Sequence, residues 1–354
     1  MRHWLTVSWM MWIWLAVAVS AHATGGEAGL RIGAWNIQHL GHGQQKSYPI
    51  LSHVASTFDF LAIQEVMTAE GVQRLQQQLE KDTGEKWGLL YSGRLGRGSY
   101  REKYAFLWRE AKVDYVDGAV VYVDKREAFI REPFAARFAT ADGTLRFVAA
   151  TVHILYGGSV TARTPEILAL RGYWDWLDAL FPEDDHLILL GDFNLAPSHE
   201  AWGPLKEVAR PLIVEGATTL SSIDGRFANL YDNIWVPKES TLNITASGIL
   251  AFPAAIGWSH EKARRHVSDH APVYMVVGEG EVSVDSPGIA PPASPKGAAE
   301  VERHEGSVRG NRNSMIYHWE ACPSYNDIAP RNRVPFESRE EAEAAGYRAA
   351  GNCP

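Results

Sequence analysis

The chain has 354 residues, which is enough for one large domain and a second, small one at about 100–200 residues per domain. Its formal net charge of −8 excludes a broadly basic surface that would bind polyanions anywhere, so any contact with a nucleic acid must be confined to a local site. Both of its two cysteines, Cys322 and Cys353, lie in the last part of the sequence.

The first residues follow the order of a secretory signal peptide. The basic residue Arg2 precedes an apolar run at 9–19, and the run ends at the small-residue pattern A-H-A at 21–23. This run is shorter than the roughly 20 residues needed to cross a bilayer as a helix. We therefore expect residues 1–23 to be cleaved after Ala23, which makes the mature chain secreted or periplasmic, without stable membrane association. An uncleaved membrane anchor is the alternative.

From Arg31 to Val277, short apolar runs alternate with amphipathic segments, which favours a layered fold of helices and strands. The clearest helix is predicted at 165–180, with Thr164 as its N-cap and Pro165 in its first turn, and a second helix at 69–80. The predicted strands are the runs at 30–36, 60–64, 104–108, 146–153, 186–191, 233–236 and 272–277.

The character of the sequence changes after this region. Residues 279–309 are rich in Pro, Ala and Ser without an apolar period, and they are predicted to be a linker between a catalytic domain at 28–278 and a small module at 310–354. In the module, Ser338 and Glu341 form a capping box that predicts a helix at 342–350.

Polar residues stand at the ends of the predicted strands of the large domain, where buried strands give way to loops. This position indicates a site on one rim of a sheet. Each residue alone has a simpler explanation as a solvated loop residue or a turn former. Together they supply hard oxygen ligands for a cation such as Mg²⁺ and groups that move protons, which phosphodiester hydrolysis needs. The set comprises Asn36, Glu65, His153, Asp192, Asn194, Asp232, Asp269 and His270.

The sequence around these residues resembles the endonuclease/exonuclease/phosphatase superfamily, and its deoxyribonuclease I branch most closely. The matching segments occur in the family's order and span about 30–277: WNIQ, IQEV, SYREKYAFLWR, IREPFAARF, TVHILYG, ILLGDFN, LYDNIWV and SDHAPV. The resemblance implies an α+β fold, a four-layer α/β/β/α sandwich in which two packed mixed β-sheets are flanked by helices. It places the site in a groove at the sheet ends.

The resemblance also implies a metal centre that holds Mg²⁺, or alternatively Mn²⁺ or Ca²⁺. Glu65 would bind the metal, while Asn36 and Asp269 would complete its coordination or position a bound water. Asn36 is also a phosphate contact in this interpretation. Asp192 and Asn194 would contact the phosphate or a second metal.

Two histidines resemble the family's proton-transfer groups. His270 would be the general base, held in its tautomer by Asp232, and His153 would be the general acid, oriented by Glu102, with the two roles depending on the strand that is attacked. Arg131 is a predicted phosphate contact through its guanidinium group. Other histidines, at 39, 42 and 53, are expected at the surface, and the tyrosines at 100 and 104 are expected to pack rather than react.

These features predict an exported, metal-dependent, monomeric endonuclease that acts most readily on DNA. The sequence departs from the family at Gln38 and Met67, where arginines that enter the DNA minor groove would stand, so single strands and RNA remain open as substrates. The alternatives are a phosphodiesterase of phospholipids or other small diesters that uses the same core, or a catalytically silent nucleic-acid-binding protein. The intact catalytic set disfavours the last.

The C-terminal module resembles the metal-binding domain of the Ada repair protein. A zinc site needs four ligands, and only His318, Cys322 and Cys353 are evident, so a disulfide between the two cysteines is the preferred interpretation and zinc the alternative. Arginines are interleaved with aromatic residues in this module. They predict either a tether for nucleic acid or a solvated charged face.

Overall fold

The computed structural model describes residues 29–42, 45–98, 100–182 and 186–283, and residues 308–353 with gaps at 320–321, 326, 330–331, 337–338, 345–346 and 352. The chain divides into two compact units, residues 1–292 and 293–354. The predicted signal peptide and most of the predicted linker, residues 284–307, lie outside the described residues, so both stay predictions. None of the helices in the described ranges is long and apolar enough to span a membrane.

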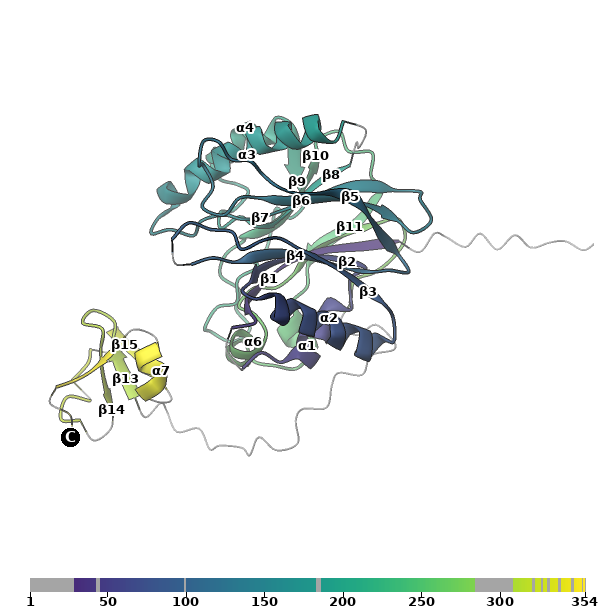
Figure 1. Cartoon of the computed structure of the whole chain (residues 1–354). Coiled ribbons are helices and arrows are strands. Elements are labelled where there is room, and N and C mark those ends of the chain that lie inside the picture. Colours follow the sequence, from purple (N-terminus) through teal and green to yellow (C-terminus); the bar gives the residue numbers. More distant parts are fainter. Residues whose placement is uncertain are drawn as a thin grey trace, which may run out of the picture. The chain divides into compact units, whose positions relative to one another are not determined.

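Two six-stranded sheets, face to face, form the centre of the large unit (Figure 1). The first sheet has the order β11-β12-β1-β2-β4-β3 and consists of Ile244–Ile249, Val273–Val277, Leu30–Leu40, Phe60–Val66, Lys103–Arg109 and Trp87–Tyr91. The second has the order β5-β6-β7-β8-β10-β9 and consists of Val113–Val121, Phe134–Thr140, Arg146–His153, Leu187–Asp192, Asp232–Pro237 and Ala209–Pro211. Each sheet mixes parallel and antiparallel neighbours.

Helices cover the outer face of each sheet, which completes the predicted four-layer sandwich (Figure 1). Below the first sheet lie α1 (Tyr48–Ala55), α2 (Ala69–Thr83) and α6 (His260–His266), and α3 (Val160–Leu180) and α4 (Gly203–Lys206) lie above the second. The short η1 (Glu200–Trp202) and α5 (Phe252–Ala255) complete the helices described in this unit.

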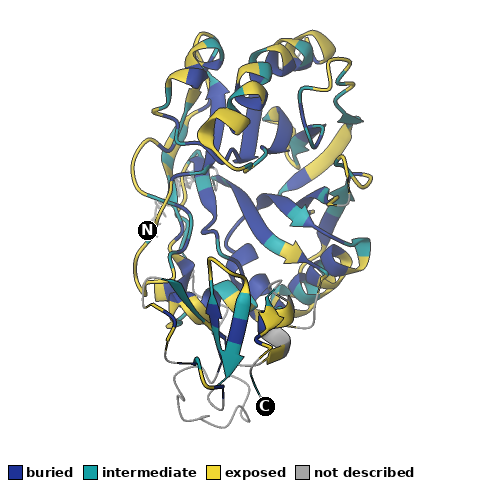
Figure 2. Ribbon diagram, turned by 90° about the vertical axis from the view of Figure 1, so that its left-hand side faces the viewer, coloured by how far each residue is buried: buried dark blue, intermediate teal, exposed yellow. Residues whose placement is uncertain are grey.

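The central strands are buried on both faces because their side chains alternate between two cores. In β1, Ile32 and Ala34 join the core between the sheets, whereas Trp35 and Ile37 join the core under α1 and α2. In β8, Leu190 and its neighbours alternate in the same way between the inter-sheet core and the core under α3. This two-residue period explains the near-continuous apolar runs in the sequence. Figure 2 shows the result as dark-blue strands inside outer helices with exposed yellow surfaces.

The long helix α3 begins earlier than predicted. Its N-cap is Ser159, whose side chain accepts a hydrogen bond from the Ala162 backbone, so Thr164 and Pro165 lie inside the helix. Tertiary contacts stabilise the extra turn: Arg163 donates to the Tyr156 carbonyl at 2.6 Å. The prediction failed because a proline near a helix start resembles a first-turn proline in sequence.

The small unit contains β13 (Val308–Asn311), β14 (Ile316–Trp319), β15 (Arg333–Phe336), α7 (Arg339–Ala344) and β16 (Arg348–Ala349), with the four strands in one sheet of order β15-β13-β14-β16. The predicted helix at 342–350 is therefore wrong in its second half, because residues 348–349 pair with β14 instead. Strand pairing overrides local helix propensity here. Ser338 of the predicted capping box lies outside the described residues.

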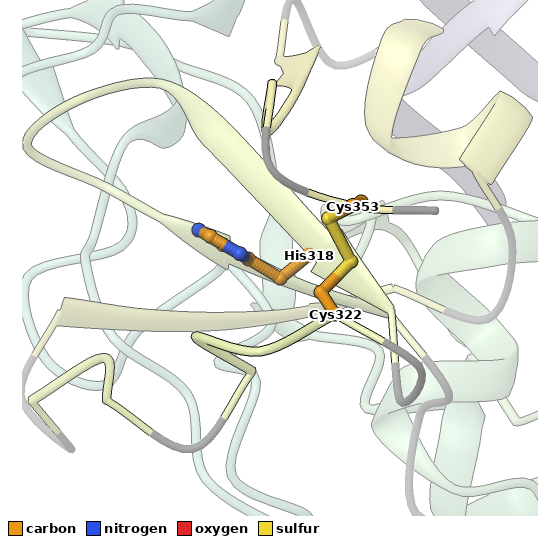
Figure 3. A group of neighbouring side chains, drawn as sticks. All are labelled: His318, Cys322 and Cys353. Carbon is orange, nitrogen blue, oxygen red and sulfur yellow. A yellow bond between two sulfur atoms is a disulfide. The ribbon is translucent and has the colours of Figure 1, made fainter.

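Cys322 and Cys353 are joined by a disulfide that closes the small unit. Figure 3 shows His318 beside this bond, and its ring nitrogen lies within 4.8 Å of both sulfur atoms. A disulfide leaves neither sulfur as the thiolate that zinc requires, so the described state of the module fits the disulfide interpretation. The small core around Val308, Tyr317 and Phe336 gains a covalent link of the kind that small exported domains use.

Candidate active site

Strand pairing brings the predicted catalytic residues of the second sheet together. In the parallel pair β7 and β8, His153 lies opposite Asp192, and in the antiparallel pair β10 and β8, Asp232 lies opposite the same Asp192. All three side chains are at least nine-tenths buried. The register of these three strands therefore places an imidazole and a carboxylate on either side of one central carboxylate.

The first imidazole is held by a carboxylate from the other sheet. His153 Nδ1 lies 2.9 Å and 3.1 Å from the two oxygens of Glu102, which directly precedes β4. Burial lowers the pKa of the His153 imidazole, but the Glu102 and Asp192 carboxylates outweigh this effect and raise the pKa above its usual value. With Nδ1 bound to Glu102, Nε2 is the nitrogen that faces the site.

The second imidazole is held in the same way, with the sheets exchanged. His270, which precedes β12 of the first sheet, has Nδ1 2.7 Å from Oδ2 of Asp232 in the second sheet. Burial lowers the pKa of His270, but Asp232 and Asp192 outweigh it and raise the pKa well above its usual value. Ser268 fixes the backbone here, because its hydroxyl accepts from the His270 N–H and donates to the Asn36 carbonyl.

Both free imidazole nitrogens converge on Asp192. Its Oδ2 lies 3.6 Å from His153 Nε2 and 3.8 Å from His270 Nε2. The same oxygen accepts a hydrogen bond of 3.0 Å from the Asn36 side-chain amide. Burial alone would raise the pKa of Asp192, but the two histidines lower it, so the carboxylate stays ionised between them. The centre of the site is thus an anion flanked by two imidazoles, each of which can accept or donate a proton at Nε2.

The predicted metal ligands lie on three segments: Asn36 on β1, Glu65 near the end of β2, and Asp269 directly before His270. Asn36 Nδ2 also donates to Glu65 Oε1 at 2.9 Å, while Asn36 Oδ1 accepts from the Gln38 backbone. Asn36 therefore positions the two carboxylates around it, and its own oxygen already has a donor. Glu65 keeps 14% of its side-chain surface exposed, and Asp269 is partly buried. Two carboxylates that open toward solvent fit the oxygen-rich coordination of Mg²⁺.

Among the described residues, Asp192, Asp232 and His270 form another candidate metal-binding group, whose ligand atoms lie within 4.8 Å of one another. His270 Nδ1 already pairs with Asp232, so this trio has the arrangement of a proton-transfer pair next to a third group. We prefer Glu65 and Asp269 as ligands because their carboxylates are more accessible.

Two predicted phosphate contacts turn out to have structural partners. The Arg131 side chain is buried, and its Nε and Nη2 donate to the backbone carbonyls of His153 and Ile154 at 2.8–3.1 Å. Its guanidinium thus first of all positions the His153 backbone, which sequence reasoning did not anticipate. Asn194 Nδ2 likewise donates to the Ile154 carbonyl at 2.8 Å. Phosphate binding by either residue stays a prediction.

Several residues that shape the site were missed or misjudged from the sequence. Lys46 donates to the backbone carbonyls of Ile37 and Val267, and burial lowers its pKa to about 8. Buried Glu166 accepts the N–H groups of Ile130 and Leu155, which flank Arg131 and His153 in the chain. An acid on the apolar face of a predicted helix was the available signal for Glu166.

The histidines expected at the surface and the tyrosines expected to pack differ in their actual positions. His53 is buried, contrary to expectation, because α1 packs this face against the core. His39 and His42 are exposed, but His39 contacts Glu65. Tyr104 is fully buried, and its hydroxyl accepts the His153 N–H at 3.0 Å, so it packs and also positions the imidazole.

Comparisons with known proteins agree with this architecture. The model described as Endonuclease/Exonuclease/phosphatase family matches residues 33–201, and a model described as ArfC, rather than an Ada-type domain, matches residues 286–349. A deoxyribonuclease of Thioalkalivibrio sp. (strain K90mix) is 56% identical over 256 residues, which cover 70% of this chain and 71% of the relative. Human deoxyribonuclease-1-like 2 is 33% identical over 296 residues, and the match covers 74% of this chain and 97% of the relative.

Solved structures show the same fold at low sequence identity. An endonuclease/exonuclease/phosphatase family protein from Bacteroides thetaiotaomicron has a TM-score of 0.53 and 17% identity, with 72% of this chain and 96% of that one covered. The human Nocturnin catalytic domain has a TM-score of 0.52 and 16% identity, with the same coverage of 72% and 96%. The sandwich, the order of the motifs and the extent of the identity with the deoxyribonuclease relative agree: this chain belongs to the endonuclease/exonuclease/phosphatase family.

Proposed function

We propose that this protein is an exported, divalent-metal-dependent endonuclease that hydrolyses phosphodiester bonds in DNA. The observation that carries the proposal is the convergence of His153 Nε2 and His270 Nε2 on one Asp192 oxygen, at 3.6 Å and 3.8 Å. Two imidazoles that face each other across one position suit a reaction in which one group takes a proton from water and the other gives one to a leaving alkoxide. The DNA substrate and the export rest on the named relatives and on the signal-peptide pattern.

The residues of this chain divide the work as follows. His270 removes a proton from the attacking water through Nε2, while Asp232 holds Nδ1 and stabilises the imidazolium that forms. His153 donates a proton to the leaving oxygen through Nε2, and Glu102 supports it in the same way. Glu65 and Asp269 would hold Mg²⁺, Mn²⁺ or Ca²⁺, which when bound would offset the negative charge of the phosphate in the transition state.

Purified mature protein should be incubated with supercoiled plasmid, single-stranded DNA, RNA and sphingomyelin, with Mg²⁺ or with EDTA. We expect nicking of the plasmid that EDTA abolishes and that Glu65→Gln reduces strongly. Turnover of sphingomyelin with no nucleic-acid cleavage would move the protein to lipid substrates. Cleavage that persists in EDTA would contradict the metal-assisted mechanism.

A further inference from the structure

His39 stands against the carboxylate that we assign to the metal. Its ring nitrogen Nε2 lies 3.3 Å from Glu65 Oε2, and its backbone N–H donates to the same oxygen at 3.1 Å. The side chain is 53% exposed, so the imidazole reaches the centre from the solvent side. An edge-to-face contact with Tyr100, at 6.0 Å between ring centroids, supports the ring from beside.

The backbone in both segments is bent to bring these side chains together. Gln38, His39 and Glu65 have φ angles of 48°, 51° and 59°, in the left-handed region that non-glycine residues rarely adopt. The pairing of β1 with β2 shifts register over the same stretch, between Asn36 and Leu40. Bulges redirect side chains near functional sites, and local backbone strain persists only where the surrounding structure holds it.

The separation of the two side chains fits a shared ligand. Two donors that each lie about 2.1 Å from one ion, at the angles of octahedral or tetrahedral coordination, are about 3.0–3.4 Å apart. The distance from His39 Nε2 to Glu65 Oε2 falls in this interval. A hydrogen bond from His39 that only orients Glu65 would have a similar length. Metal ligation and a simple hydrogen bond are therefore distinguished by their effect on metal selectivity, not by this distance.

We propose that His39 supplies an imidazole nitrogen to the metal centre at Glu65 and so shifts its selectivity from Mg²⁺ toward transition-metal ions such as Mn²⁺. Mg²⁺ is bound almost entirely by oxygen, whereas first-row transition ions accept imidazole. Removal of the nitrogen weakens binding of Mn²⁺ more than binding of Mg²⁺. This inference rests on the proposed function, because it takes the metal centre at Glu65 as given.

The test measures metal binding to the metal-free full chain by calorimetric titration with Mn²⁺ and with Mg²⁺. His39→Gln should weaken Mn²⁺ binding about tenfold and change Mg²⁺ binding less than about twofold, a difference of about 1.4 kcal/mol or less in selectivity. His42→Gln, at an exposed histidine three residues along the chain, is the matched control and should leave both affinities unchanged. Pulsed electron paramagnetic resonance of the Mn²⁺-loaded protein should show coupling to a ¹⁴N nucleus that His39→Gln removes.

Equal losses for both ions in His39→Gln, or ¹⁴N coupling that persists in that variant, would show that His39 only orients Glu65 and would overturn the proposal. Glu65→Gln separates this result from a failure of the proposed function. If Mn²⁺ binds equally well to Glu65→Gln, the metal centre itself is misplaced. If Glu65→Gln abolishes binding while His39→Gln changes nothing, the centre stands and His39 is no part of it.

Discussion

The two imidazole–carboxylate pairs of the site have the same plan but different surroundings. Each joins a histidine of one sheet to a carboxylate of the other, so both pairs also connect the two sheets. In the His153 pair, the buried Arg131 guanidinium lies 3.7 Å from Glu102. Its positive charge opposes the carboxylates and limits the rise in the pKa of His153. Three carboxylates, those of Asp232, Asp192 and Asp269, raise the pKa of His270, which lies further above its usual value. Similar geometry therefore yields two groups with different affinities for a proton.

The largest effect is expected from removal of either imidazole. His270→Ala and His153→Ala should each lower kcat for plasmid nicking by about 10²–10⁴-fold, because general acid and base catalysis contributes on that scale. Rates under saturating plasmid and Mg²⁺, with unchanged circular dichroism as the control for folding, check this. If a variant retained a third of the activity, the substituted histidine would not take part in proton transfer.

Substitution of the carboxylate in each pair should lower the free energy of unfolding by different amounts. Glu102→Gln leaves the Arg131 cation buried without its carboxylate, so we expect the free energy of unfolding to fall by about 3 kcal/mol. Asp232→Asn leaves the His270 imidazole, which unlike a guanidinium can lose its proton, so a smaller loss of about 1 kcal/mol is expected. Urea denaturation of both variants measures this difference. Each variant should also be about 10²-fold slower in catalysis. Equal losses of stability would contradict the role given to Arg131.

The pH dependence of stability should follow His270. The Asp232 and Asp192 carboxylates hold the folded-state pKa of His270 well above the ordinary histidine value of 6.5, so between the two values the folded state binds more protons than the unfolded state. Stabilisation by the imidazolium is then fully present below pH 6.5 and is lost as the pH rises through the folded pKa. Urea titrations of metal-free protein from about pH 5 to 9 should show this decline, and His270→Gln should flatten it. An unchanged slope in the variant would assign the proton elsewhere.

A smaller effect is expected from Lys46, which connects the end of β1 to the segment before His270. Lys46→Met removes hydrogen bonds to the Ile37 and Val267 carbonyls and should lower the free energy of unfolding by about 1–2 kcal/mol. The loss should be larger at high pH, because burial lowers the pKa of Lys46 from 10.5 to about 8, so the unfolded state binds more protons between these values and wild-type stability rises with pH there. Denaturation at about pH 7 and pH 9.5 tests both statements.

The sequence predicted the central strands and the polar residues at their ends because both carry strong local signals. All seven predicted strands exist, since a strand buried on both faces reads as an apolar run. Strands β5 and β11 were missed because they lie at sheet edges and almost none of their side chains is buried, which leaves no apolar run to find. Their positions follow from pairing with distant neighbours.

The site was less predictable than the fold in its supporting contacts. The motifs named His153, His270 and their carboxylates, but sequence cannot show that Arg131 donates to backbone carbonyls, because that depends on two loops meeting. The same holds for Lys46. One of its partners, Ile37, is nine residues away in the sequence, and the other, Val267, is 221 residues away. Contact of His39 with Glu65 depends on a bulge, which has no sequence signature here.

The most direct test of the central claim is to compare DNA with bis(p-nitrophenyl) phosphate, a diester whose good leaving group needs no general acid. Under the roles proposed here, His153→Ala loses about 10²–10⁴-fold on DNA but recovers most of its activity on the nitrophenyl diester, whereas His270→Ala stays impaired on both. The reverse pattern would exchange the acid and the base. Equal impairment of both variants on both substrates would contradict the division of proton transfer between the two histidines.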